Sequence, residues 1–80
     1  SIVTYGWLLY KQGRYEEARK VLQRAVALDI YGSSELLLHY GDVMFALGDT
    51  YRATLYWQKA LDAGHDKQEI EQRMKKAEGK

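Results

Sequence analysis

"KQGRYEEA", residues 11–18, and "ALGDTYRA", residues 46–53, share one pattern at a distance of 35 residues. Each places a Gly, a Tyr close behind it and an Ala five positions after the Gly. The same offset separates four pairs of small residues: Gly6 and Gly41, Gly13 and Gly48, Ala18 and Ala53, Ala25 and Ala60. An internal period of this length is the sequence signature of stacked repeats.

Apolar residues recur with helical spacing twice in each unit. The first stripes are Ile2, Tyr5, Gly6 and Leu9, then Leu37, Tyr40, Gly41 and Met44. The second stripes are Ala18, Leu22, Ala25 and Val26, then Ala53, Trp57, Ala60 and Leu61. The chain contains no Pro that would interrupt a helix. The pattern therefore predicts two helices in each unit.

Glycines mark the expected helix ends. Gly13 and Gly48 follow the first helix of each unit, and Gly tolerates the left-handed conformation that stops a helix. Asp49 can then cap the next helix. Between the units, "DIYGSSE", residues 29–35, reads as a turn with Gly32 as the stop and Ser33 or Ser34 as the next start.

Small residues also predict how the two helices of a unit meet. Gly6 should lie against Ala18, and Gly41 against Ala53, because a large side chain at a close crossing would push the helices apart. Leu22 and Trp57 should fill the space beside these contacts.

The tail "DKQEIEQRMKKAEGK", residues 66–80, predicts one more helix, opened by Asp66 with Glu69 as its capping-box partner. Its narrow apolar stripe consists of Ile70, Met74 and Ala77, and the remaining residues are mostly charged. That composition suits a helix that closes the end of a stack against water. The alternative is the first helix of a third unit, but the tail lacks the Tyr-Gly pair of the other two.

With its Tyr-Gly pairs and its Ala and bulky positions, the chain resembles the tetratricopeptide repeats. The segments "TYGWLLYKQGRYEEA" and "LHYGDVMFALGD" are similar to the last repeats of longer bacterial arrays. The resemblance implies an all-α fold, a right-handed α-solenoid of antiparallel helix hairpins with about five helices. It divides the chain into a first repeat at 1–32, a second at 33–65 and a capping helix at 66–80.

The composition of the chain argues against several classes of function. Eighty residues suffice for one domain, and without Cys no disulfide or thiolate metal cluster can support it. A net charge of +1 gives no electrostatic footprint for nucleic acid, and no apolar run approaches the roughly 20 residues that span a bilayer. We therefore expect neither a nucleic-acid partner nor insertion into a membrane.

No residue pattern predicts catalysis. His39 and Asp42 share a helix face, but zinc needs three or four ligands, and the only other His is His65. No Gly-rich phosphate loop, nucleophile elbow or pair of catalytic carboxylates is found. We expect a protein that is not an enzyme and holds no metal or cofactor.

Binding of a protein or peptide is the favoured function, because the first helices of stacked hairpins line a concave face. The predicted partner-binding residues on it are Val3, Trp7, Tyr10, Lys11, Leu38, His39, Asp42 and Phe45. Two alternatives remain open: a structural module that associates weakly with itself, and a regulatory segment of a larger protein. Val3, Trp7 and Tyr10 could also belong to a core completed by further helices.

Overall fold

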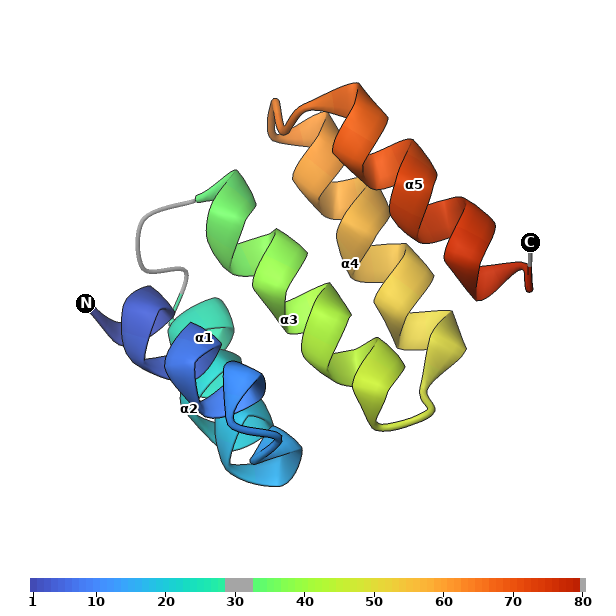
Figure 1. Cartoon of the computed structure of the whole chain (residues 1–80). Coiled ribbons are helices and arrows are strands. Elements are labelled where there is room, and N and C mark those ends of the chain that lie inside the picture. Colours follow the sequence, from blue (N-terminus) through green and yellow to red (C-terminus); the bar gives the residue numbers. More distant parts are fainter. Residues whose placement is uncertain (29–32, 80) are drawn as a thin grey trace.

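A computed structural model describes residues 1–28 and 33–79, which form five helices and no strand (Figure 1). The helices are α1 (Ile2–Lys11), α2 (Tyr15–Ala27), α3 (Ser34–Ala46), α4 (Thr50–Asp62) and α5 (Lys67–Ala77). The prediction of an all-α helical repeat fold with about five helices is confirmed.

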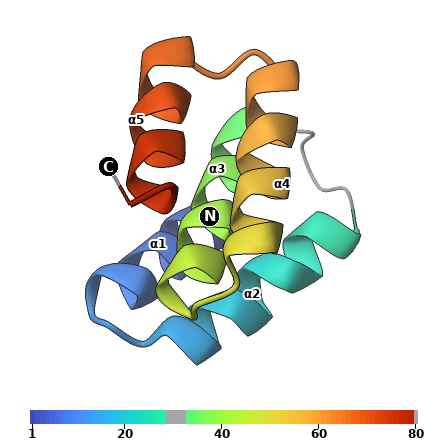
Figure 2. The ribbon, with the colours of Figure 1, turned by 90° about the vertical axis from the view of Figure 1, so that its right-hand side faces the viewer.

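The helices stack in chain order. Each helix packs against the next one, and α1 also contacts α3. Helix α3 therefore lies at the centre, with the α1–α2 hairpin on one side and α4 followed by α5 on the other (Figures 1 and 2). Residues from α1 and α3 can consequently share a surface although they are more than 20 positions apart in the sequence.

The turns inside the two hairpins have the same geometry. The amide of Arg14 donates to the carbonyl of Leu9 at 2.9 Å, and the amide of Asp49 donates to the carbonyl of Met44 at 2.9 Å. Gly13 and Gly48, with φ angles of 79° and 87°, supply the left-handed residue that this turn requires. Both predicted helix stops are confirmed.

The helix starts differ from one another. Side chains cap α3, α4 and α5. The amide of Glu35 donates to Ser33 Oγ at 3.2 Å, and the amide of Arg52 donates to Asp49 Oδ1 at 3.0 Å. At the start of α5, the amide of Glu69 donates to Asp66 Oδ2 at 3.2 Å. Helix α2 has no side-chain cap; Arg14 precedes it and donates instead to Glu17. The caps predicted at Ser33, Asp49 and Asp66 are confirmed, while the carboxylate of Glu69, the predicted capping-box partner, pairs with His65 and Arg73 instead. Gly32, the predicted stop between the units, lies outside the described residues.

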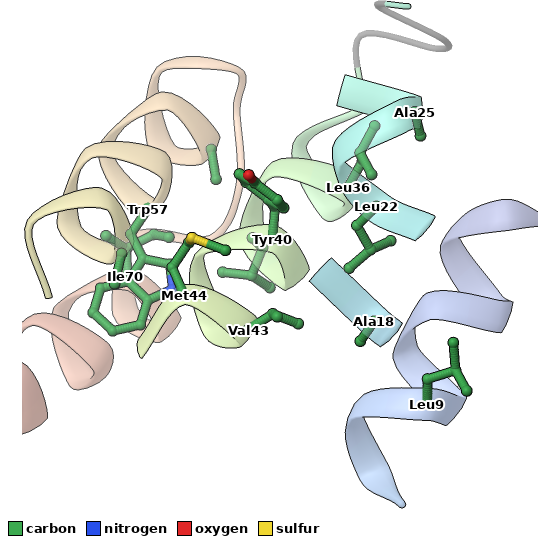
Figure 3. Close-up of a cluster of buried hydrophobic side chains, with 13 residues drawn as sticks. Leu9, Ala18, Leu22, Ala25, Leu36, Tyr40, Val43, Met44, Trp57 and Ile70 are labelled. Atoms are coloured by element: carbon green, nitrogen blue, oxygen red, sulfur yellow. The ribbon is translucent and has the colours of Figure 1, made fainter. Parts of the chain in front are cut away.

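The core consists of apolar residues from all five helices (Figure 3). Four alanines, all at the predicted positions, are completely buried: Ala18, Ala25, Ala53 and Ala60. The largest fully buried side chain is Trp57. Ile70 brings α5 into the same core, with Met74 and Ala77 partly buried beside it. The predicted apolar face of the tail is therefore the one that packs, while the division into two repeats and a cap stays a prediction.

The bulky residues lie directly over the glycines rather than beside them. A Cβ atom added to Gly6 would overlap the Leu22 side chain. One added to Gly41 would lie 2.5 Å from Trp57 Cδ1 and 3.1 Å from the carbonyl oxygen of Ala53. The sequence analysis placed the small residues against each other; the structure shows that each glycine mainly makes room for a large side chain from the second helix.

Gly41→Ala should reduce the free energy of unfolding by roughly 1–3 kcal/mol, the usual cost of overpacking. Helix propensity alone would favour Ala by about 1 kcal/mol, so the two effects have opposite signs. Gly6→Ala should also destabilise the protein, because the added Cβ would lie 2.5 Å from Cγ of the completely buried Leu22. Urea unfolding followed by circular dichroism measures both, and a stabilised Gly41→Ala protein would contradict the close contact.

Candidate functional site

An open groove of about 370 Å³ runs between α1 and α3. We call it the α1–α3 groove; Val3, Thr4, Trp7, Glu35 and His39 line it. Val3 and Thr4 lie one helical turn before Trp7 on α1, and Glu35 lies one turn before His39 on α3. The contact between these two helices thus produces a surface that neither helix would form alone.

Trp7 is the largest side chain in the groove. It is 37% exposed, and the centre of its ring lies 6.2 Å from that of His39. The Nζ atom of Lys11, one turn later on α1, lies 5.2 Å from the centre of the indole ring, within the range of a cation–π contact. Part of the indole therefore packs in the protein and part faces water, as in side chains that anchor protein interfaces.

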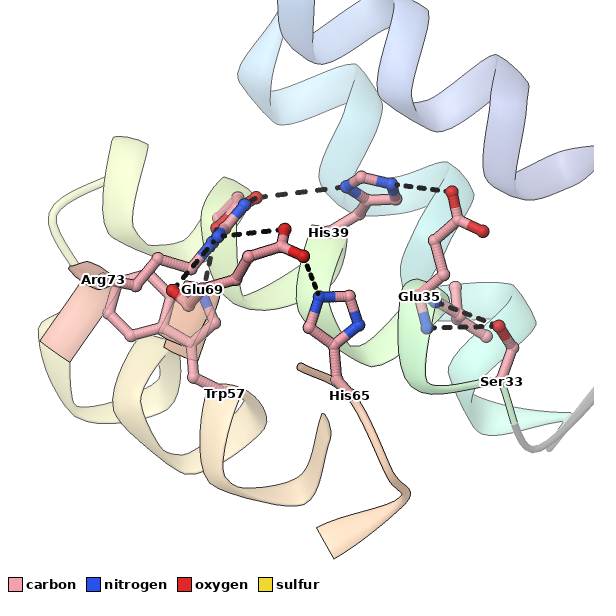
Figure 4. A network of polar contacts seen from close by, with 9 residues as sticks. Ser33, Glu35, His39, Trp57, His65, Glu69 and Arg73 are labelled. Carbon is pink, nitrogen blue, oxygen red and sulfur yellow. Dashed lines mark hydrogen bonds and ion pairs between the residues drawn. The ribbon is translucent and has the colours of Figure 1, made fainter. Parts of the chain in front are cut away.

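His39 lies between Glu35 at the α1–α3 groove and Asp42 (Figure 4). Its Nε2 atom lies 3.4 Å from Glu35 Oε1, and its Nδ1 atom lies 3.9 Å from Asp42 Oδ2. The ring is mostly buried, and Nδ1 has no hydrogen-bond partner within the accepted geometry. His39 thus forms the floor of the groove, while the more exposed Glu35 forms its acidic rim.

Asp42 holds α5 in place. Its Oδ1 atom accepts from Trp57 Nε1 at 3.0 Å and from Arg73 Nε at 2.7 Å, and its Oδ2 atom accepts from Arg73 Nη2 at 3.1 Å. The Asp42 side chain is only 11% exposed. The two bonds to one guanidinium make a bidentate ion pair, the strongest geometry between these groups. This carboxylate therefore serves the structure and is not free for a partner.

Electrostatics favour the charged form of Asp42. Burial by itself raises the pKa of this carboxyl, but the nearby His39 imidazole, the hydrogen bonds from Arg73 and Trp57 and the positive charge of Arg73 outweigh burial. The pKa of Asp42 consequently lies below its ordinary value. Arg73 shows the reciprocal effect: the bond to Asp42 raises the pKa of its guanidinium.

A second, smaller depression of about 150 Å³ continues past Asp42 toward α5. Its lining residues are Tyr10, Asp42, Phe45, Trp57, Arg73 and Lys76. The ring centres of Phe45 and Trp57 are 5.6 Å apart, as are those of Tyr10 and Tyr15. Burial and the neighbouring Asp42 raise the pKa of the Tyr10 hydroxyl, so it stays neutral at ordinary pH. This depression is aromatic at its base and carries basic side chains at its rim.

The structure separates the eight predicted binding residues into two groups. Val3, Trp7, Tyr10, Lys11 and His39 lie along the α1–α3 groove or next to it. Leu38 is 3% exposed and belongs to the core, contrary to its expected place on the open face. Asp42 is committed to Arg73 and Trp57, and Phe45 is partly buried against Trp57.

Five residues that line the two depressions were not among the predicted binding residues: Thr4, Glu35, Trp57, Arg73 and Lys76. Glu35 had a usable signal, because it precedes His39 by one helical turn. Arg73 and Lys76 had none, since they belong to a charged tail whose docking side depends on contacts far away in the sequence.

The described parts of the chain, 1–28 and 33–79, offer no group of three or more His, Cys, Asp or Glu side chains that could hold a metal ion. No helix among these residues is long and apolar enough to cross a membrane.

Comparison with protein families gives a match to the tetratricopeptide repeat over residues 2–30. This match and the five-helix fold together support a tetratricopeptide-type repeat. The matched segment covers the α1–α2 hairpin, and the hairpin turn after α3 repeats the turn after α1. No curated protein and no solved structure matches the chain. The tetratricopeptide repeat is a protein-interaction module, which indicates a protein partner and a scaffold of the kind that is generally not catalytic.

Asp42→Asn should loosen α5 and lower the free energy of unfolding by roughly 1.5–3 kcal/mol at pH 7, the range for losing hydrogen bonds to a charged group. Because the folded-state pKa of Asp42 is depressed, its contribution is complete above the unfolded value of about 3.9. It disappears as the pH falls through the folded-state pKa. Urea unfolding of both proteins between pH 7 and pH 2 should therefore show the difference shrinking below about pH 4.

Glu17→Gln is the matched control, because it removes an exposed pair with Arg14 at 2.6 Å. Solvent screens such surface pairs, so this variant should change the free energy of unfolding much less than Asp42→Asn. Equal effects of the two substitutions would mean that Asp42 does not fasten α5.

Proposed function

We propose that this chain is a non-catalytic interaction scaffold that binds a peptide or a helix of a partner protein in the α1–α3 groove. The observation that supports it best is the position of Trp7. Its indole, 37% exposed, forms one wall of an open groove of about 370 Å³. Large rigid aromatic side chains of this kind bury much area on binding at a small cost in conformational entropy.

The groove also indicates the chemistry of its ligand. Val3 and Trp7 provide an apolar wall for an aliphatic or aromatic side chain. Glu35 places a carboxylate at one end, which favours a basic side chain or an amide donor of the ligand. Lys11 and Lys76 place positive charge toward the other end, where an acidic side chain would be preferred. We therefore propose a ligand segment with a basic, then apolar, then acidic order along the groove.

Selection from a phage-displayed library of random 12-residue peptides tests this function. Peptides that bind the protein should contain the apolar residue flanked by opposite charges. The substitution Trp7→Ala should weaken their binding by at least tenfold, measured by isothermal titration calorimetry, because it removes one wall of the groove.

Tyr51→Ala is the control. Tyr51 is also an exposed aromatic residue, but it lies on α4 and lines neither depression. Its replacement should leave the affinity unchanged, and both variants should keep the circular dichroism spectrum of the unaltered protein. Selected peptides that bind the Trp7→Ala and Tyr51→Ala proteins equally well would refute binding in this groove.

A further inference from the structure

The imidazole of His39 lies between two carboxylates at the floor of the α1–α3 groove (Figure 4). Its Nε2 atom lies 3.4 Å from Glu35 Oε1, at the rim of the groove. Its Nδ1 atom is buried without a hydrogen-bond partner, 3.9 Å from Asp42 Oδ2. A buried ring nitrogen without a partner is uncommon in proteins and needs an explanation.

The number of carboxylates that His39 can bind depends on its protonation. A neutral imidazole carries one N–H group, whereas a protonated imidazole carries two. The neutral ring can donate to Glu35 or to Asp42, and its other nitrogen then presents a lone pair to the remaining carboxylate. The protonated ring can donate to both and places a positive charge between them. Histidine ordinarily changes its charge between pH 5 and pH 8, so both forms are accessible under mild conditions.

The two carboxylates differ in their freedom to move. Asp42 is 11% exposed and is held by Arg73 and Trp57. The Glu35 side chain is 66% exposed, and within residues 1–28 and 33–79 its carboxylate pairs with His39 alone. A change in the charge of His39 should therefore move the Glu35 carboxylate and leave Asp42 in place.

Charged and titratable groups approach His39 from α1, α3 and α5. On α3 they are the two carboxylates. On α1 the Trp7 ring lies beside the imidazole and carries the ammonium of Lys11, 5.2 Å from its centre. The other groups near Asp42 and Arg73 are Tyr10, Glu69 and His65, and Glu69 pairs with both Arg73 and His65. Of all these side chains, the two histidines are the ones that ordinarily titrate between pH 5 and pH 8.

We propose that His39 is a positioning residue for Glu35, and that its protonation decides whether this carboxylate can bind a basic side chain of the ligand. The inference rests on the proposed binding of a peptide in the α1–α3 groove. With neutral His39, the Glu35 carboxylate can turn to an ammonium or guanidinium group of the peptide. With protonated His39, a charge-assisted hydrogen bond holds Glu35 to the ring, and the imidazolium repels the cation of the peptide. The groove therefore prefers a basic ligand residue at neutral pH and loses this preference at mildly acidic pH.

Isothermal titration calorimetry at pH 7.5 and pH 5.5 tests the inference. The probes are a peptide without histidine, selected at pH 7.5 from the phage-displayed library, and the same peptide with Gln in place of its basic residue. Binding of the basic peptide should weaken by about threefold or more at pH 5.5, a factor typical of a surface charge pair. The Gln peptide should bind equally at both pH values. His39→Gln should also make binding of the basic peptide independent of pH, because an amide cannot gain the proton.

His65→Gln is the matched control. It removes the other buried histidine, which pairs with Glu69 and lines neither depression. This variant should keep the loss of affinity at pH 5.5. The inference is overturned if the unaltered protein binds the basic peptide equally at the two pH values, or if the His39→Gln protein retains the pH dependence. Neither result would contradict peptide binding at Trp7.

Nuclear magnetic resonance of the free protein separates this inference from the proposed function. Between pH 8 and pH 5, the carboxyl carbon of Glu35 should show a shift that coincides with the titration of the His39 ring. His39→Gln should abolish this shift, and His65→Gln should not. A Glu35 signal that does not follow His39 overturns the positioning role even where peptides bind. Peptides that bind without Trp7 refute the proposed site, but they leave the coupling of His39 and Glu35 supported by the resonance measurement.

Discussion

The contact between Gly41 and Trp57 is the constraint on which the rest of the structure depends. Without a side chain at position 41, the indole can lie directly on the backbone of α3, which sets the distance between α3 and α4. The buried indole N–H then needs an acceptor, and Asp42 supplies it. The same carboxylate binds Arg73, so the packing of one hairpin also determines where α5 docks.

Much of the fold could be predicted because its determinants are local or recur at one offset. A Gly with positive φ ends a helix wherever it follows one, so Gly13 and Gly48 identify their turns without knowledge of the rest of the fold. The buried alanines follow from the same repeat, since a position that is small twice at a spacing of 35 residues indicates a close crossing. The pattern could not predict which side chain each glycine contacts. Helical spacing predicts the face of the helix on which the glycine lies, but not the rotamer of the residue packed against it.

The candidate site was predicted less completely for a related reason. Periodicity placed Leu38 and Asp42 in the same register as Val3 and Trp7, and that register is correct. It does not tell which of these residues other helices cover. Leu38 is buried because α3 is the central helix, and Asp42 is occupied because α5 brings Arg73 to it from 31 positions away. Only the end of the stack, where α1 has a single neighbouring hairpin, leaves the equivalent positions open.

Equivalent positions in the two hairpins thus have the same place on the backbone but make different contacts. Trp7 and Asp42 occupy the same place on their helices, yet one faces an open groove and the other fastens α5. Tyr5 and Tyr40 are identical residues, but Tyr40 belongs to the core because α2 packs against α3 and because Tyr56 packs against its ring. The contacts that close each hairpin, Gly6 with Leu22 and Gly41 with Trp57, lie on a third side of α1 and α3. On the first helix, the residues that line the α1–α3 groove are therefore distinct from Gly6, which closes the hairpin, although Val3 also packs against the core.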